Sequence, residues 1–72
     1  MTKFVGKGMM QTYSQEISMS ESVTVQSLPA LLNIPKDLSK NLIVVRGNKK
    51  LDSDNLISNN DEIFLFLAVM GG

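Results

Sequence analysis

The longest apolar run in the sequence, Ile63–Met70, is followed by the pair Gly71-Gly72. Its eight residues are far fewer than the roughly 20 that a helix needs to span a membrane. We therefore predict that this run forms a β-strand, from residue 62 to about residue 69. A chain of 72 residues buries only about 60% of the surface of its unfolded form, so we expect one domain over residues 1–72 with one thin core.

The composition excludes several classes of function. The sequence has no cysteine and no histidine, so it lacks a thiol nucleophile, the usual base at neutral pH and the usual zinc ligands. Its seven basic and seven acidic residues balance, which gives no electrostatic basis for binding nucleic acid or an anionic membrane. The first ten residues contain lysines but lack the apolar segment of a signal peptide. We expect a cytoplasmic protein, and we disfavour a metal-dependent or acid/base enzyme.

The first twenty residues are predicted to form a β-hairpin. The run Thr2–Gly6 is β-prone. In the run Thr12–Met19, one set of side chains alternates with another, the first being Tyr13, Gln15, Ile17 and Met19 and the second Ser14, Glu16 and Ser18. A loose loop around residues 8–11 joins the two strands.

The segment SLPALLNIP, residues 27–35, is predicted to form the helix. Ser27 can act as its N-cap, and Pro29 is tolerated in the first turn. An alternative start at Thr24 would place Pro29 in the second turn and kink the helix. We expect the helix to end before Pro35. Its apolar face then consists of Leu28, Leu31 and Leu32.

The second half of the chain is predicted to supply the remaining strands. The run Leu42–Arg46 begins with four apolar residues, which favours an interior strand, and a Gly47-Asn48 turn leads to a short return strand through Leu51. Asn59 and Asn60, which tolerate the left-handed conformation, turn the chain into the last strand. The order ββ-α-ββ-β predicts an α+β fold with a mixed sheet and one helix on one face.

This order and the stretch NNDEIFLFLAVMGG, residues 59–72, resemble the ThiS/MoaD family of ubiquitin-like sulfur carriers. The family shows a DGDEI-like turn, an apolar last strand and a free diglycine in this position. Here Asn60 replaces the usual turn glycine, and Leu67-Ala68 stand where molybdopterin-type carriers often have Pro-Pro. The resemblance implies a β-grasp fold with a mixed sheet of four to five strands, one main helix on one face and a flexible Gly71-Gly72 tail.

The resemblance also implies a chemical role for Gly72. An ATP-dependent, ubiquitin-activating-like enzyme adenylates the Gly72 carboxylate, and a sulfur donor protein converts it into a thiocarboxylate that delivers sulfur to an acceptor synthase. The sulfur serves thiamine thiazole or molybdopterin biosynthesis, or tRNA thiolation. The chain is then a protein co-substrate and not an enzyme. It binds no cofactor, because the partner uses the ATP, and it is a monomer when free.

The chemistry of a glycine carboxylate agrees with this role. A carboxylate resists nucleophiles at neutral pH, whereas its adenylate carries a good leaving group. Glycine has no Cβ beside the carbonyl, and two glycines form a thin thread that can enter a narrow active site. Two alternatives stay open: a ubiquitin-like modifier whose activated Gly72 is joined to lysines, and a plain β-grasp binding module whose tail has no chemistry.

Alternation along the last strand predicts its two faces. Ile63, Leu65 and Leu67 share one face. The resemblance implies that the helix covers Ile63 and Leu65, which leaves two phenylalanines on the open face. Aromatic side chains on an uncovered sheet face are typical of a protein interface, unless loops cover them. The predicted partner interface consists of Phe64, Phe66, Ala68 and Met70.

Three other groups of residues are weaker candidates. Arg46, Lys49 and Lys50 form either a small basic patch for an acidic partner or a solvated hairpin, and we favour the hairpin. Met9 and Met10 are predicted to cap an edge of the core. The acidic residues of the second half have a spacing that fits no metal-binding loop; they are Asp52, Asp54, Asp61 and Glu62.

Overall fold

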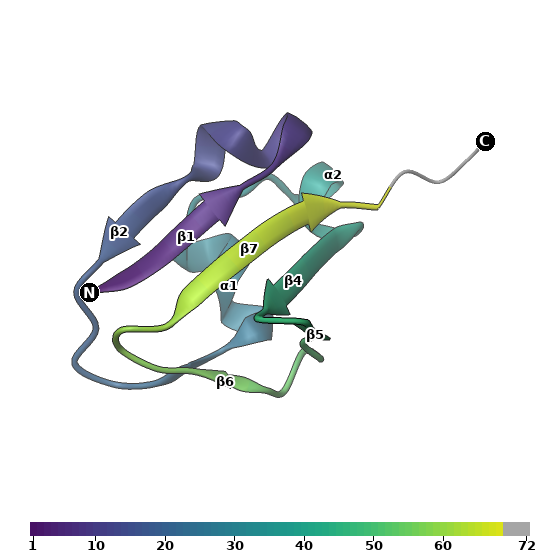
Figure 1. Ribbon diagram of the computed structural model, residues 1–72. Coiled ribbons are helices and arrows are strands. Elements are labelled where there is room, and N and C mark those ends of the chain that lie inside the picture. Colours follow the sequence, from purple (N-terminus) through teal and green to yellow (C-terminus); the bar gives the residue numbers. More distant parts are fainter. Residues whose placement is uncertain (69–72) are drawn as a thin grey trace.

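The computed structural model describes residues 1–68 of the chain. Five strands form a mixed sheet in the order β2-β1-β7-β4-β5, and the helices α1 and α2 lie on one side of it (Figure 1). These strands are β1 (Thr2–Gly6), β2 (Gln15–Ile17), β4 (Leu42–Arg46), β5 (Lys49–Lys50) and β7 (Glu62–Leu67). The predicted α+β class and mixed sheet are confirmed.

The helical segments are all short. The 3-10 turn η2 (Val25–Ser27) leads directly into α1 (Leu28–Leu31), and α2 (Lys36–Ser39) follows. Another 3-10 segment, η1 (Gly8–Tyr13), connects β1 to β2. Within residues 1–68, no helix has the length and apolar character needed to cross a membrane.

The strand β7 lies at the centre of the sheet. It pairs in parallel with β1, where Phe4 lies opposite Ile63, and antiparallel with β4, where Val44 lies opposite Leu65. All four of these side chains are buried. Because β7 has a neighbouring strand on each side, its backbone donors and acceptors are satisfied within the sheet.

The hydrophobic core lies between this sheet and the helical segments. Thr2 is also buried there, and its hydroxyl donates a hydrogen bond to the carbonyl oxygen of Ser58 at 2.9 Å. The buried apolar residues come from nearly every element, and they are Phe4, Met10, Val25, Leu28, Leu32, Ile34, Val44, Leu51, Ile57, Ile63 and Leu65.

The predicted N-terminal hairpin forms, but its second strand is shorter than expected. Thr2 lies opposite Ile17, and Phe4 lies opposite Gln15. Residues 12 and 13, which were expected to begin the second strand, instead belong to the helical segment η1. The alternation of the sequence could not reveal this, because η1 is held by contacts with β1.

Two contacts hold η1 against β1. The N–H of Gly6 donates to Oγ of Ser14, the residue that follows η1, at 2.8 Å, and Gly6 lies so close to the carbonyl group of Met10 that a Cβ there would overlap its oxygen. Met10 is fully buried in the core, whereas Met9 is 69% exposed. The prediction that both methionines cap an edge of the core is therefore wrong, since only Met10 contributes to it.

The helix α1 begins at Leu28, as the start after Ser27 predicts. Ser27 does not cap it with its side chain, because its hydroxyl donates to the carbonyl oxygen of Thr24 at 2.6 Å. The 3-10 turn η2 starts after Thr24, so the helical segment as a whole begins at the alternative position. A change from 3-10 to α geometry at Leu28 accommodates Pro29 in the first α-helical turn.

The end of α1 differs from the prediction. Pro35 does not stop the helix, because α1 has already ended at Leu31. Asn33 adopts a left-handed conformation with φ +58°, and the N–H of Ile34 donates to the carbonyl oxygen of Pro29 at 2.8 Å. This is the bond of a Schellman motif. Leu31 is 39% exposed, so its predicted place on the buried face is also wrong.

The predicted turns of the second half are confirmed. Gly47 has φ +64°, as the first central residue of a type II′ hairpin requires, and it joins β4 to β5. Asn60 has φ +73° and turns the chain into β7. The strand β7 ends at Leu67, while the predicted end near residue 69 lies outside the described residues.

A second, two-stranded sheet was not predicted. It pairs β3 (Val23–Thr24) with β6 (Leu56–Ile57). The guanidinium of Arg46 secures this region by donating to the carbonyl oxygen of Leu56 at 2.9 Å and to the carboxylate of Asp61 at 3.1 Å. Strands of two residues are too short to show an alternating pattern, so the sequence contains no usable signal for them.

Candidate functional site

The two faces of β7 differ as predicted. Ile63 and Leu65 have no exposed surface, because they point to the side of the sheet that carries the helices. Phe64 is half-buried and Phe66 is 39% exposed, because their side chains point to the other side of the sheet. We call this second side the open face.

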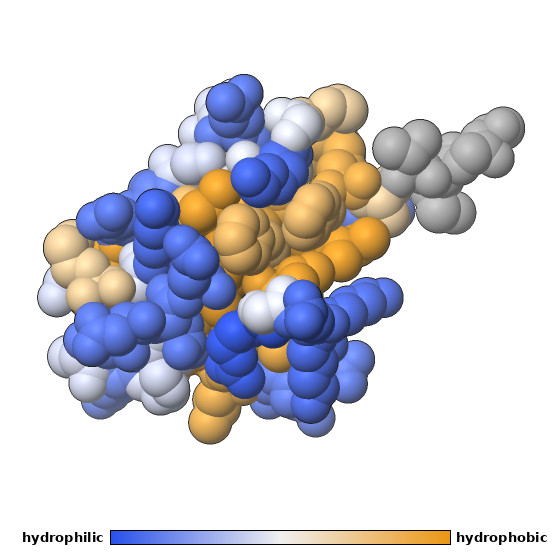
Figure 2. Space-filling model, in the orientation of Figure 1, coloured by the Kyte–Doolittle hydropathy of each residue, from blue (hydrophilic) through white to orange (hydrophobic). Residues whose placement is uncertain are grey.

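Apolar neighbours surround the two phenylalanines on the open face. The register places Val5 of β1 and Val45 of β4 on either side of Phe64, and Ile43 of β4 beside Phe66. Directly opposed residues of neighbouring strands point to the same face. We refer to these five residues as the open-face patch. Figure 2 shows apolar surface along the middle of this face, with hydrophilic surface around it.

A hollow adjoins the patch where β7 ends. It has a volume of about 290 Å³ and is bounded by Lys7, Gly8, Met9, Phe66 and Leu67. Gly8 has φ +57°, and its left-handed conformation begins the turn from β1 into η1. The hollow therefore lies between the exposed side chain of Met9 and the last residues of β7.

Lys7 links the hollow to the patch. Its Nζ lies over the ring of Phe64, 5.5 Å from the ring centroid, in the range of a cation–π interaction. Its backbone N–H donates to the carbonyl oxygen of Leu65 at 2.9 Å, which continues the parallel pairing of β1 with β7. The ammonium group is thus held above the patch on the open face.

The opposite end of the open face is charged. Lys3 and Glu62 form a salt bridge of 3.9 Å, and both side chains are more than half exposed, so the pair contributes little to stability. Glu16 lies on the other side of Lys3 in the sheet register. The open face therefore has a charged end at the start of β7 and an apolar end where β7 finishes.

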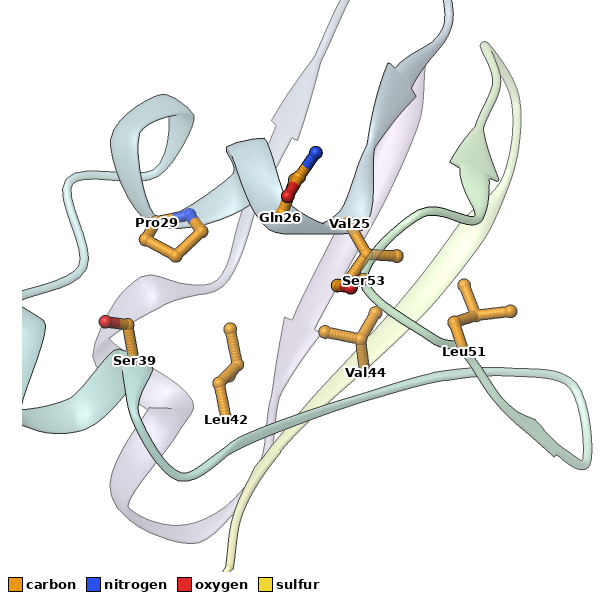
Figure 3. Close-up of a pocket in the computed structure, with 8 residues that line it drawn as sticks. All are labelled: Val25, Gln26, Pro29, Ser39, Leu42, Val44, Leu51 and Ser53. Atoms are coloured by element: carbon orange, nitrogen blue, oxygen red, sulfur yellow. The ribbon is translucent and has the colours of Figure 1, made fainter.

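A second hollow lies on the other side of the sheet. It has a volume of about 320 Å³ and lies between η2, α1 and β4 (Figure 3). Leu42, Val44 and Leu51 project into it from the sheet side, and Pro29 faces them from α1. Since Val44 and Leu42 point to the helical side of β4, this hollow does not adjoin the open-face patch.

The remaining predicted site residues are not brought together. Ala68 is half-buried, and its N–H donates to the carbonyl oxygen of Asn41 at 2.7 Å. Asp61 is engaged with Arg46, while Asp52 and Asp54 are exposed. No group of acidic residues in the described part of the chain could hold a metal ion. Met70, Gly71 and Gly72 lie outside the described residues.

Sequence reasoning missed most of the patch. The sequence placed Val5, Ile43 and Val45 in predicted strands only, and their approach to Phe64 and Phe66 depends on the strand order. Lys7 and Met9 gave no signal, because their positions depend on η1. Comparison of the sequence with protein-family models and with curated proteins found no match.

Proposed function

We propose that this protein is a sulfur carrier of the ThiS/MoaD type with a β-grasp fold. A mixed sheet whose first and last strands pair in parallel, with helical segments on one face, supports the β-grasp assignment. The observation that carries the proposal is an exposed aromatic patch at the end of a central strand that leads, in sequence, to Gly71 and Gly72. In this proposal, an activating enzyme binds the patch and reacts with the Gly72 carboxylate.

The position of β7 supports this arrangement. Ile63 and Leu65 anchor the strand in the core, so the chain leaves the sheet from a fixed point beside the patch. Five residues follow Leu67 in the sequence, and a chain of that length spans at most about 18 Å. An enzyme docked on Phe64 and Phe66 must therefore hold ATP within about this distance of Leu67.

The proposed reaction takes place at the carboxyl carbon of Gly72. A carboxylate oxygen attacks the α-phosphorus of ATP, and pyrophosphate leaves. Hydrosulfide supplied by the donor protein then attacks the carbonyl carbon, and the bond to AMP breaks. The carboxylate oxygen that joined phosphorus departs with AMP, so one oxygen of the terminus is exchanged for sulfur.

In this reaction the carrier places its terminus, and the partner enzyme supplies the catalytic groups. The chain has no histidine and no cysteine, so it offers neither an imidazole base nor a thiol that would compete for the activated carbonyl. Binding through the patch holds the terminus near the nucleotide, which turns a bimolecular encounter into an effectively intramolecular one.

The intact mass of the protein from its native cells tests the proposal. A mass increase equal to the exchange of one oxygen for sulfur is the expected result. A branched peptide that joins Gly72 to a lysine, found after proteolytic digestion, would instead identify a ubiquitin-like modifier. If neither signal is found in actively growing cells, a plain binding module is favoured.

A further inference from the structure

The open face is built from three rows of side chains that cross the strands. The first row is charged and contains Glu16, Lys3 and Glu62. The second runs from Val5 through Phe64 and Val45 to Lys50, and the third contains Lys7, Phe66 and Ile43. The second and third rows thus have apolar centres, and each has a lysine at one end.

The two lysines lie at diagonally opposite corners of the open-face patch. Lys7 extends the third row on the β1 side, and its ammonium lies over Phe64. Lys50 extends the second row on the β5 side, because it lies opposite Val45. Both residues are exposed, and neither forms a salt bridge with any residue from 1 to 68.

The other basic residues near this face are engaged or point away. Arg46 binds Asp61, and Lys3 pairs with Glu62. Lys49 lies opposite Arg46 in the register, one residue along from Lys50, so its side chain points to the other face of the sheet. The basic trio seen in the sequence is therefore divided, and only Lys50 belongs to the open face.

We infer that the activating enzyme meets the open-face patch with an apolar surface that carries two carboxylates, one for Lys7 and one for Lys50. This inference rests on the proposed function. The chain as a whole has no net charge, so the attraction comes from the local arrangement. If the enzyme were shifted along the strands towards the first row, its carboxylates would approach Glu16 and Glu62 and be repelled by them. The charges therefore favour one position of the enzyme along the strands.

Lys49 and Lys50 supply a matched test. Lys49→Glu and Lys50→Glu make the same change of charge on neighbouring exposed residues of one short strand, but on opposite faces. The probe is an enzyme purified from the native cells by its ability to exchange pyrophosphate into ATP in the presence of the wild-type chain. The apparent Kd is the chain concentration that gives half-maximal exchange.

Lys50→Glu and Lys7→Glu should each raise the apparent Kd about five- to tenfold at low salt, and Lys49→Glu should leave it unchanged. The difference should shrink as ionic strength rises, because screening weakens the interaction between exposed charges. Thermal unfolding of Lys49→Glu and Lys50→Glu should match that of the wild type, since these side chains are exposed, whereas Lys7→Glu should melt slightly lower because it loses the contact with the Phe64 ring.

Two outcomes would overturn the inference and are distinguishable. If exchange occurs but Lys50→Glu and Lys49→Glu have equal Kd values, the carboxylate pairing is wrong while the carrier function stands. If no enzyme of the cell exchanges pyrophosphate in response to the chain, the proposed function fails and the inference fails with it.

Discussion

Leu65 and Phe66 are neighbours in the same strand, yet their surroundings are opposite. Leu65 has no exposed surface, and Phe66 retains 39%. Both residues pair with β4, Leu65 with Val44 and Phe66 with Ile43, so the difference in exposure comes from what covers each face of the sheet. Helical segments cover the face of Leu65, and no described element covers the face of Phe66. A strand that is apolar on both sides can therefore pack into the core with one side and leave the other side exposed for a partner protein.

The largest loss of stability is expected at Leu65, on the face of the sheet that the helical segments cover. Leu65→Ala removes buried carbon atoms from the centre of the core and should lower the free energy of unfolding by about 2–5 kcal/mol. Urea denaturation followed by circular dichroism measures this change. An unchanged denaturation midpoint would show that Leu65 is not a core residue.

The second-largest loss of stability is expected at Gly6, where η1 folds back on β1. Gly6→Ala would place a Cβ against the carbonyl oxygen of Met10 and should destabilise the protein by about 1–3 kcal/mol, as overpacking does. Val5→Ala is the matched control, because Val5 is the preceding residue and points to the open face. If both variants melt like the wild type, η1 does not pack on Gly6 in solution.

The smallest effect on stability is expected on the open face. Phe66→Ala should lower the free energy of unfolding by less than about 1.5 kcal/mol, because the side chain is already partly exposed. The same variant should weaken binding of the activating enzyme about tenfold or more, as the loss of an aromatic interface residue does. Denaturation and pyrophosphate exchange measured on one preparation separate the two effects. A loss of stability as large as that of Leu65→Ala would reverse the assignment of the faces.

The parts of the fold that the sequence predicts well are those with local causes. The strands β1, β4 and β7 follow from alternation or apolar runs, and the turns at Gly47 and Asn60 follow from residues that tolerate positive φ. The two faces of β7 could be assigned for the same reason, because a strand alternates with a period of two.

The parts that could not be predicted depend on contacts between distant residues. Residues 12 and 13 alternate like a strand, but packing of Met10 into the core draws them into η1. Asn33 adopts a positive φ and ends α1 before Pro35 can, whereas Asn55 and Asn59 do not adopt a positive φ, so an asparagine does not by itself show where a helix ends. The patch around Phe64 and Phe66 exists only because β1 and β4 flank β7, and strand order is a property of the whole sheet.

The central claim is that the carboxylate of Gly72 is the reacting group. Its most direct test is ATP–pyrophosphate exchange by the activating enzyme with three proteins: the wild type, a form lacking Gly72, and a form with one residue added after Gly72. The enzyme must bring the carboxyl carbon within about 3–3.5 Å of its reaction partner, and one residue moves the terminus by about 3.3 Å. The shortened and extended forms should therefore lose exchange while they melt at the wild-type temperature, because glycine contributes little apolar burial. Exchange by either form at the wild-type rate would contradict the account, since it would show that the Gly72 carboxylate does not react.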